Sequence, residues 1–208
     1  MTGRRGRSAR TVPSAPTAAE RSRSLYLPPW RIDVTIRAGV GTPLPVSTLA
    51  AAMAAALTAA GAPRPASIGL VLSDDRELRR LNLTHMAEAG PTDVLSFPLL
   101  PPRAFPPHEG RAASAALPSG VSPADVPPPA AFVPPGRRVH LGDIVVSVER
   151  ATAQAREGRG GHSGDVRWSP ADELRLLAIH GVLHVCGWDH AEPAEEAAMR
   201  ALERRLLG

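Results

Sequence analysis

With 208 residues, the chain is long enough for one domain with a buried core, and no apolar run approaches the roughly 20 residues of a membrane-spanning helix. Its single cysteine excludes an internal disulfide, which fits the reducing cytoplasm where we expect the protein to act. The net charge of +4 permits a polyanionic partner, but all 24 basic residues are Arg, a compositional bias that weakens arguments from Arg content.

The N-terminal segment is basic and poor in hydrophobic residues. Residues 1–24 contain six Arg and a single acid, Glu20, without the hydrophobic stretch of a secretory signal. We therefore predict a disordered basic tail over 1–24, followed by one folded domain over 25–208. An organellar transit peptide, which is also rich in Arg and Ser, is the alternative.

Four segments beyond this tail are predicted to be β-strands. In the first, apolar and polar residues alternate with period two, the spacing of a strand with one buried face. The last of the four leads directly into a helix. The predicted strands are Arg31–Ile36, Ser67–Leu72, Thr92–Phe97 and Val139–Ser147.

Helices are predicted between and after these strands. Ser47 or Thr48 would cap the first, which is rich in Ala, and Ser169 followed by Pro170 is a strong start for the fourth. The second ends before Gly90, and three of its leucines are expected to face the core: Leu78, Leu81 and Leu83. The predicted helices cover residues 49–60, 73–89, 151–155, 174–185 and 193–206.

Residues 99–138 interrupt this pattern with a Pro-rich insert. Twelve of the 23 prolines lie between Pro98 and Pro135, and no apolar periodicity survives there. Such a segment cannot bury enough apolar surface to offset its ordering entropy, so we predict a mobile or irregular excursion. Deletion of Phe105–Val133 is then expected to leave a folded domain. A second flexible joint is predicted at 158–164.

Near the C-terminus, three of the seven histidines fall within eleven residues: His180, His184 and His190. His180 and His184 are four apart, so both rings lie on one face of the predicted helix. Gly187 lets the chain turn and bring His190 back toward them. Three nitrogen ligands with one open position are typical of catalytic zinc, so we predict one Zn²⁺ per chain. Cys186 points elsewhere and is expected to be a packed thiol.

A catalytic zinc site of this kind predicts a metal-dependent hydrolase, but the histidine spacing alone does not decide which bond it cleaves. Zinc peptidases place histidines at the same offsets but need a Glu directly after the first one as general base. Here that position is Gly181. A zinc peptidase whose base comes from elsewhere, such as Glu173 or Asp189, therefore stays an alternative to a hydrolase of another class.

Three parts of the chain together resemble the YbeY-type rRNA maturation endoribonucleases. The resemblance covers roughly Arg31–Leu207, apart from the insert. It implies a single α/β (α+β) domain with a four-stranded mixed sheet packed against helices, including a zincin-like metal helix. The parts are Leu81–Leu83 with Pro91–Pro98, then Leu141–Ile144 with Ala151 and Gln154–Ala155, then His180–His190.

The same resemblance implies cleavage of single-stranded RNA, in 3′-end maturation of small-subunit (16S) rRNA and in ribosome quality control. The expected partners are rRNA and the ribosome or its small subunit, and neither DNA nor a membrane. A ribosome assembly factor with a structural metal is a further alternative.

By resemblance, His180, His184 and His190 match the family's zinc ligands, and His180 is also assigned to catalysis. Because zinc-bound water ionises near pH 7, hydroxide is available without a Glu at position 181. Asp189 is a second tentative catalytic residue, as a partner that orients a ligand or carries a proton. Its alternative role is to stabilise the loop beside Trp188.

The chain departs from the family at one position near the expected substrate. Many members have an Arg that faces the scissile phosphate where this chain has Met86, preceded by His85. The cationic role is therefore vacant here or filled by another residue. Three further polar residues in the matching motifs are expected to be structural, because short polar side chains at strand ends commonly satisfy backbone groups: Asp93, Ser96 and Asp143.

Overall fold

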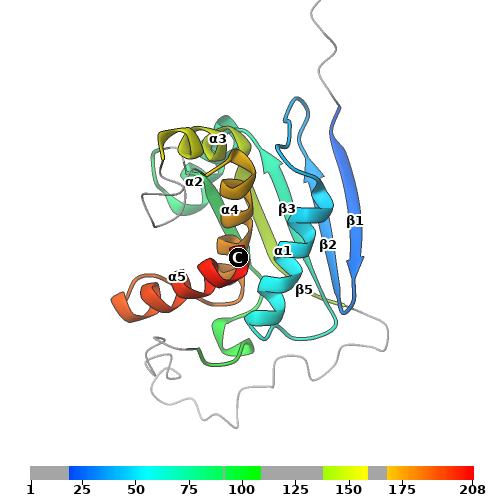
Figure 1. Ribbon diagram of the computed structural model, residues 1–208, viewed down its shortest axis with the longest axis vertical. Coiled ribbons are helices and arrows are strands. Elements are labelled where there is room, and N and C mark those ends of the chain that lie inside the picture. The colour runs from blue at the N-terminus through cyan, green and yellow to red at the C-terminus, as the bar shows by residue number, and fades with distance from the viewer. Residues whose placement is uncertain (1–18, 91, 109–137, 159–167) are drawn as a thin grey trace, which may run out of the picture.

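A computed structural model of the chain, which describes residues 19–90, 92–108, 138–158 and 168–208, is built on one mixed β-sheet (Figure 1). The five strands lie in the order β1-β2-β3-β5-β4. Their bounds are β1 Arg21–Leu27, β2 Trp30–Ile36, β3 Ala66–Ser73, β4 Val94–Pro98 and β5 Val139–Ser147. The helices are α1 Val46–Ala59, α2 Asp75–Met86, α3 Val148–Glu157, α4 Pro170–Val185 and α5 Pro193–Leu207, with a 3-10 turn η1 at Pro102–Ala104.

The middle of the sheet is parallel and its two edges are antiparallel. β2 and β5 both run parallel to β3, whereas β1 and β4 pair antiparallel with their neighbours. Every residue of β3 except Val71 is buried, as expected for a central parallel strand covered on both faces. The four strands predicted from the sequence are thus confirmed, and so is the mixed sheet.

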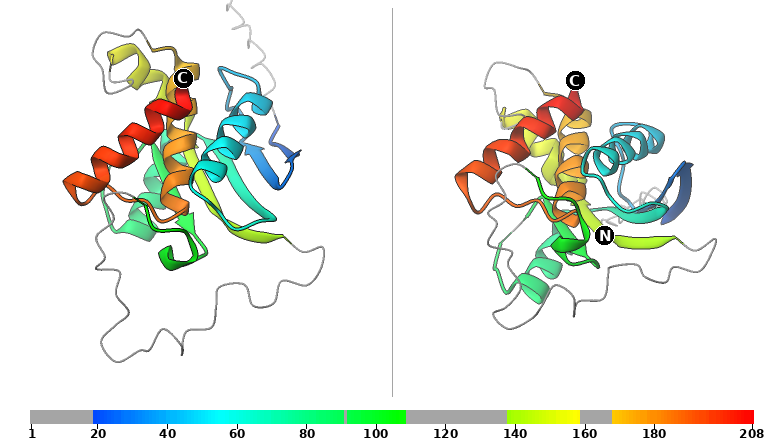
Figure 2. Two further views of the ribbon diagram at one scale, coloured as in Figure 1. Left: turned by 60° about the horizontal axis from the view of Figure 1, so that its bottom comes forward. Right: turned by 90° about the horizontal axis from the view of Figure 1, so that it is seen from below.

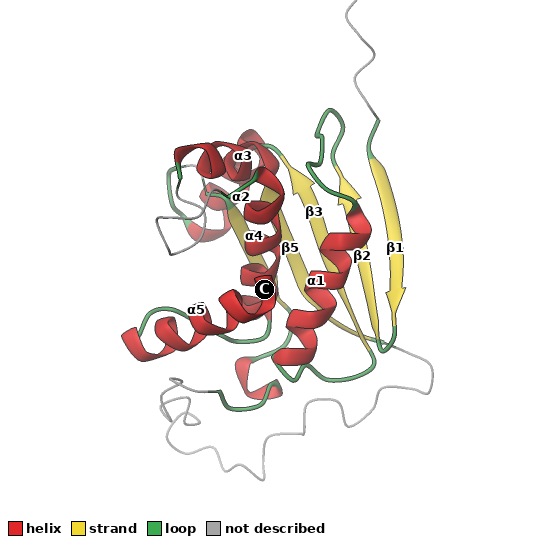
Figure 3. Ribbon diagram, in the orientation of Figure 1, coloured by secondary structure: helices red, strands yellow, loops and turns green. Residues whose placement is uncertain are grey.

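Helices cover the two faces of the sheet unequally. α1 and α4 lie over one face, where the main hydrophobic core forms (Figure 3). On the other face, Leu78 of α2 packs against Leu95 of β4 and Val145 of β5. Ile144 and Val146 belong to the main core, so alternation along β5 separates the two layers. No helix in the four described ranges is long and apolar enough to cross a membrane.

The prediction of four strands is wrong, because β1 adds a fifth at the edge. β1 begins at Arg21, inside the segment predicted to be a tail, and residues 1–18 of that tail lie outside the described residues. Its first four residues are polar and exposed, and only Leu25 and Leu27 at its end pack against the core. Polar side chains pair across the edge instead, with Ser22 Oγ 2.9 Å from Thr35 Oγ1.

Two details of the predicted helices are also wrong. α1 begins at Val46 and its N-cap is Pro45, so neither Ser47 nor Thr48 caps it. Leu83 was expected to face the core but is 60% exposed, because α2 contacts the sheet along a single narrow stripe that includes Leu78. Two other predictions are confirmed: Ser169 caps the start of α4, and the chain turns at Gly187 after the helix.

The start of the Pro-rich insert belongs to the folded domain. Phe105 is only 4% exposed and lies in the main core, directly after η1. The segment containing η1 runs beside the loop that joins α4 to α5 (Figure 2). A deletion that begins at Phe105 would therefore remove a core side chain, so the prediction that this end of the insert contributes little to the core is wrong. Residues 109–137 of the insert and 159–167 of the predicted joint lie outside the described part of the chain.

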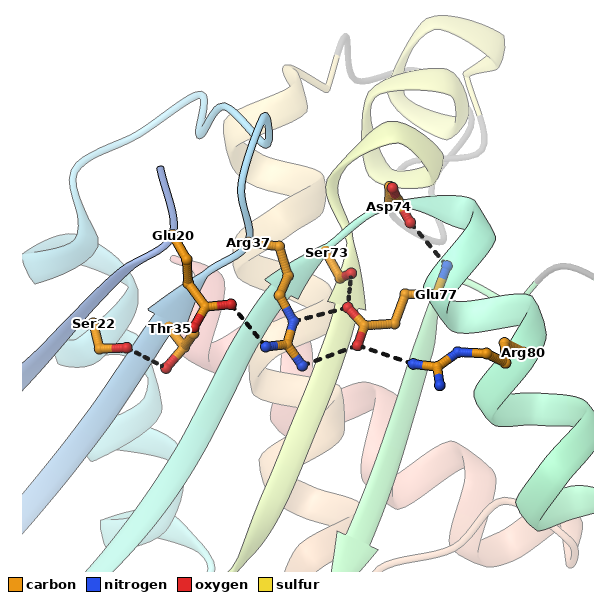
Figure 4. Close-up of polar contacts among 8 residues, drawn as sticks. All are labelled: Glu20, Ser22, Thr35, Arg37, Ser73, Asp74, Glu77 and Arg80. Atoms are coloured by element: carbon orange, nitrogen blue, oxygen red, sulfur yellow. Dashed lines mark hydrogen bonds and ion pairs between the residues drawn. The ribbon is translucent and has the colours of Figure 1, made fainter. Parts of the chain in front are cut away.

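An ion-pair network joins the sheet to α2 (Figure 4). The Arg37 guanidinium donates to both carboxylate oxygens of Glu77 at 2.9 Å and to Glu20 at 2.9 Å. Ser73 Oγ donates to Glu77 as well. Burial alone would raise the pKa of Glu77, but the bonds from Arg37 and Ser73 hold it below its usual value.

Candidate metal centre

The α4 helix carries two of the three histidines, and its sequence determines where it starts. Ser169 accepts from the Asp172 backbone N–H, and the Asp172 side chain accepts from the Ser169 backbone N–H, which is a complete capping box. Leu174, Val182 and most other residues of α4 are buried. The helix is therefore held firmly by its apolar sides, which fixes the position of the histidines.

Gly181 allows α4 to approach the sheet closely. A Cβ atom at this position would lie 2.6 Å from Cγ2 of Ile144 on β5, which is closer than real contacts allow. The Gly181 carbonyl also accepts from Ser96 Oγ of β4 at 3.2 Å. The position that carries the general base in zinc peptidases is thus a packing contact here, and a Glu side chain would not fit unless the Ile144 side chain moved.

The turn after α4 brings the third histidine back. Gly187 has φ +82°, and Trp188 N–H donates to the Leu183 carbonyl, which closes the helix. Cys186 lies just before this turn with 0% exposure, and burial raises the pKa of its thiol to about 12. Its predicted role as a packed thiol is confirmed.

The three imidazoles face one another. One ring nitrogen from each of His180, His184 and His190 lies within 4.8 Å of the other two. Nε2 of His180 is 3.0 Å from Nε2 of His184, and the centroids of the His184 and His190 rings are 5.0 Å apart. The two ligands on α4 are partly buried, whereas His190 is exposed.

The hydrogen bonds around these rings fit a bound cation. His184 Nδ1 donates to the Trp188 carbonyl at 3.0 Å, and His180 Nδ1 lies 2.7 Å from Glu203 Oε1. With its proton on Nδ1, the His184 ring turns its Nε2 lone pair toward Nε2 of His180. Burial, then the nearby His180 and His190, lowers the pKa of His184 to about 4, so this ring is neutral.

Zinc bonded to two nitrogens at about 2.0–2.1 Å in a tetrahedral site holds them roughly 3.3 Å apart, close to the 3.0 Å between these two Nε2 atoms. The donor set and the spacing therefore suit a transition metal.

Glu203 is a site residue that the sequence analysis missed. Its side chain is 3% exposed, and it reaches His180 from α5, 23 residues further along the chain. A signal was available, since Glu203 lies four positions after Met199, an apolar residue that faces inward on the same helix. A carboxylate in such an apolar stripe needs a partner.

The loop carrying His190 is held by a second unpredicted contact. His108 Nε2 lies 2.7 Å from Glu195 Oε1, and its ring stacks on Trp188 with centroids 3.9 Å apart. Glu195 Oε1 also accepts from the Asp189 backbone N–H at 3.1 Å. His108 comes from the insert, so the insert helps to position the loop between α4 and α5.

The other predicted site residues have structural partners. The Asp189 carboxylate accepts from the His190 backbone N–H at 2.8 Å, which matches its loop-stabilising alternative. Asp93 Oδ1 accepts from the Val94 backbone N–H, and its Oδ2 accepts from Gln154 Nε2 at 2.9 Å. Asp143 pairs with His140 on β5.

An outer cleft of about 610 Å³ opens at the three histidines. Met86, which is 44% exposed, lines it together with Asn82 of the same helix. His85 instead packs edge-on against Phe97. Among the described residues, no Arg lines this cleft. Met86, where the resemblance led us to expect an Arg, therefore faces the cleft, and no Arg among the described residues takes that place.

Comparison with known proteins agrees with this arrangement. The family model described as "Endoribonuclease YbeY" matches residues 45–208. A curated protein of that name from Roseiflexus sp. (strain RS-1) is 37% identical over 145 residues, which cover 69% of this chain and 69% of that protein. One from Chloroflexus aurantiacus (strain ATCC 29366 / DSM 635 / J-10-fl) is 37% identical over 157 residues, or 75% of this chain and 80% of that protein.

Proposed function

This chain belongs to the YbeY endoribonuclease family, whose members are hydrolases acting on RNA, and we propose that it cleaves single-stranded RNA with one zinc ion per chain. We further propose that its substrate is rRNA, in 3′-end maturation of the small-subunit (16S) rRNA and in ribosome quality control. Its partner would then be the ribosome or its small subunit, and its site of action the cytoplasm. DNA and membranes are not expected partners.

The observation that carries the metal proposal is the convergence of three imidazole nitrogens, all within 4.8 Å of one another. His180, His184 and His190 would hold the ion. Zinc, when bound, supplies a Lewis acid for a phosphoryl oxygen and a water that ionises near pH 7.

The protein's own residues prepare this site. Glu203 holds the Nδ1 proton of His180, and the Trp188 carbonyl holds that of His184, so both rings keep one tautomer and one orientation. Asp189 is the remaining candidate for a proton carrier, since it lines the outer cleft next to His190. The likeness of α4 to a zincin helix stays a prediction.

The peptidase alternative loses its support at Gly181. Any side chain at this position would meet the Ile144 side chain, which would have to move to admit the general base of that class. Glu173, one of the two substitutes considered, is 4% exposed and does not line the outer cleft. Phosphodiester hydrolysis with metal-activated water needs no carboxylate at position 181.

The proposal is tested by cleavage of a 5′-labelled single-stranded RNA under single-turnover conditions, with metal content measured on the same samples. His184→Ala should lose both the metal and the cleavage. His140→Ala removes a histidine from β5 that pairs with Ser67 and Asp143 outside the site, and it should keep both.

Two outcomes would contradict the proposal. Metal-loaded wild-type protein that leaves single-stranded RNA intact would refute the nuclease activity. If His180→Ala is folded and metal-free but supports normal rRNA processing in cells, the assembly-factor alternative with a structural metal is favoured.

A further inference from the structure

The three metal-binding rings are not held in the same way. Nδ1 of His180 bonds Glu203, and Nδ1 of His184 bonds the Trp188 carbonyl. The ring of His190 makes no hydrogen bond to another described residue, and this histidine is exposed. Its position therefore depends on the backbone of the loop that carries it, between α4 and α5.

The start of the insert is docked against this loop. We call residues 102–108 the docked segment. It is anchored away from the metal position by Phe105, which is buried in the main core, and by Pro106, which lies against the turn that follows α1. At the loop itself, a Cβ atom on Gly187 would lie 3.1 Å from Cα of Pro102. The docked segment therefore connects the core of the domain to the loop that carries the third histidine.

His108, at the end of the docked segment, makes two contacts with the loop and the helix after it. Its ring stacks on that of Trp188, with centroids 3.9 Å apart and an angle of 10° between the planes. Its Nε2–H donates to Glu195 Oε1 at 2.7 Å, because a carboxylate accepts hydrogen bonds and does not donate them. The His108 side chain is 7% exposed, so both contacts are shielded from water.

One oxygen of Glu195 joins His108 to the residue before the third histidine. Oε1 accepts from His108 and also from the backbone N–H of Asp189, which directly precedes His190. The Glu195 side chain is 10% exposed, so its carboxylate depends on such bonds. Without His108, this carboxylate would lose a partner and turn toward water, and Asp189 and Trp188 would each lose a contact that holds the loop. His190 would then no longer be held in the one position that suits the metal.

We propose that His108 is a positioning residue for His190, and that the docked segment thereby sets the affinity of the three histidines for zinc. The inference rests on the proposed metal site. His108 does not line the outer cleft, so it acts through the loop and not on the metal or the substrate. The start of the Pro-rich insert then belongs to the metal centre, although it supplies none of the three histidines.

A double-mutant cycle on zinc affinity tests this inference. Competition with a chromophoric chelator would measure the affinity of wild type, His108→Ala, His190→Ala and the double variant. His108→Ala should weaken zinc binding about 10-fold, at the lower end of the roughly 10- to 100-fold effect of residues that orient metal ligands. In the His190→Ala background, the same change should alter the affinity by no more than about 2-fold, because the ligand that His108 positions is absent.

Two further variants separate positioning from a general loss of structure. His108→Gln can still donate to Glu195 and should recover most of the wild-type affinity. His140→Ala removes a histidine from β5 and should bind zinc as wild type does. Equal weakening by His108→Ala in both backgrounds, or unchanged affinity in folded His108→Ala, would overturn the inference. Wild-type protein that binds no zinc would instead refute the proposed metal site on which it rests.

A measurement on wild-type protein alone covers the case in which His108→Ala fails to fold. Because coupling between two sites is reciprocal, bound zinc should in turn hold the docked segment in place. Amide hydrogen exchange within residues 104–108 should therefore slow by about 10-fold when zinc is added, and by more than exchange in β1 at the edge of the sheet. Exchange in the docked segment that zinc slows no more than in β1 would overturn the inference.

Discussion

Two polar clusters in this protein are built in opposite ways. Around Arg37, every charged group meets its opposite, and the guanidinium bonds two carboxylates at 2.9 Å (Figure 4). Around His180, His184 and His190, three ring nitrogens of like chemistry lie within 4.8 Å of one another. The first cluster pairs its charges within the protein, so it contributes to folding. The second gathers three metal-binding nitrogens at one point, so it contributes to function.

The largest expected effect is at the cluster of His180, His184 and His190. Zinc at about 1,000 times its dissociation constant should raise the free energy of unfolding of the wild-type protein by about 4 kcal/mol. His184→Ala should gain almost nothing from zinc. Denaturant unfolding with zinc and with chelator measures both, and His140→Ala should behave as wild type. A zinc-induced gain that survives in His184→Ala would show that the cluster is not the metal site.

Glu203 sharpens the comparison, because it binds Nδ1 of His180, the ring nitrogen on the side away from the metal position. Glu203→Gln should weaken zinc binding by about 10- to 100-fold, since His180 loses the partner that fixes its tautomer and orientation. Competition with a chromophoric chelator measures the affinity. Glu196→Gln on the same helix removes the surface pair with Arg200 and should leave the affinity near wild type. Equal losses in both variants would exclude a specific role for Glu203.

A substitution in the Arg37 cluster should change stability and leave zinc binding unaffected. Arg37→Ala should lower the free energy of unfolding by about 1 kcal/mol, because the pair with Glu77 is bidentate but partly exposed. Zinc affinity should not change. A double-mutant cycle with Glu77→Gln isolates the pair, and a coupling free energy near zero would mean that the network does not stabilise the fold.

The smallest effect is expected at Met86. An Arg there would place positive charge in a cleft whose described lining has none, beside the developing charge of the transition state. Met86→Arg should therefore cleave single-stranded RNA at least as fast as wild type, in single-turnover assays at fixed salt. Leu83→Arg adds the same charge on the same helix outside the cleft. Slower cleavage by folded, metal-loaded Met86→Arg would show that position 86 does not face the phosphate.

Local patterns made the core of the site predictable. His180 and His184 share a helix face, Gly187 provides the turn, and Ser169 with Pro170 marks the helix start, all within one short stretch of chain. The rest depends on contacts between distant segments. Glu203 reaches the site from α5, and the insert contributes a stacked histidine, neither of which spacing within one helix can reveal.

The same distinction holds for the fold. Strands with an apolar face were found from their periodicity, including β5 from Val139 to Ser147. β1 was missed because its first four residues are polar and exposed, and its pairing with β2 continues the sheet along them. Phe105 was assigned to a loop because the Pro-rich segment around it has no apolar periodicity, although its side chain is buried in the core.

The central claim, that the three histidines hold one metal ion required for RNA cleavage, is tested most directly by titration of metal-free protein with zinc. Bound zinc and the single-turnover rate of RNA cleavage would be measured at each addition. The rate should rise in proportion to bound zinc and reach its plateau at one ion per chain. Full cleavage before zinc is added, or zinc bound at one per chain without any cleavage, would contradict the account.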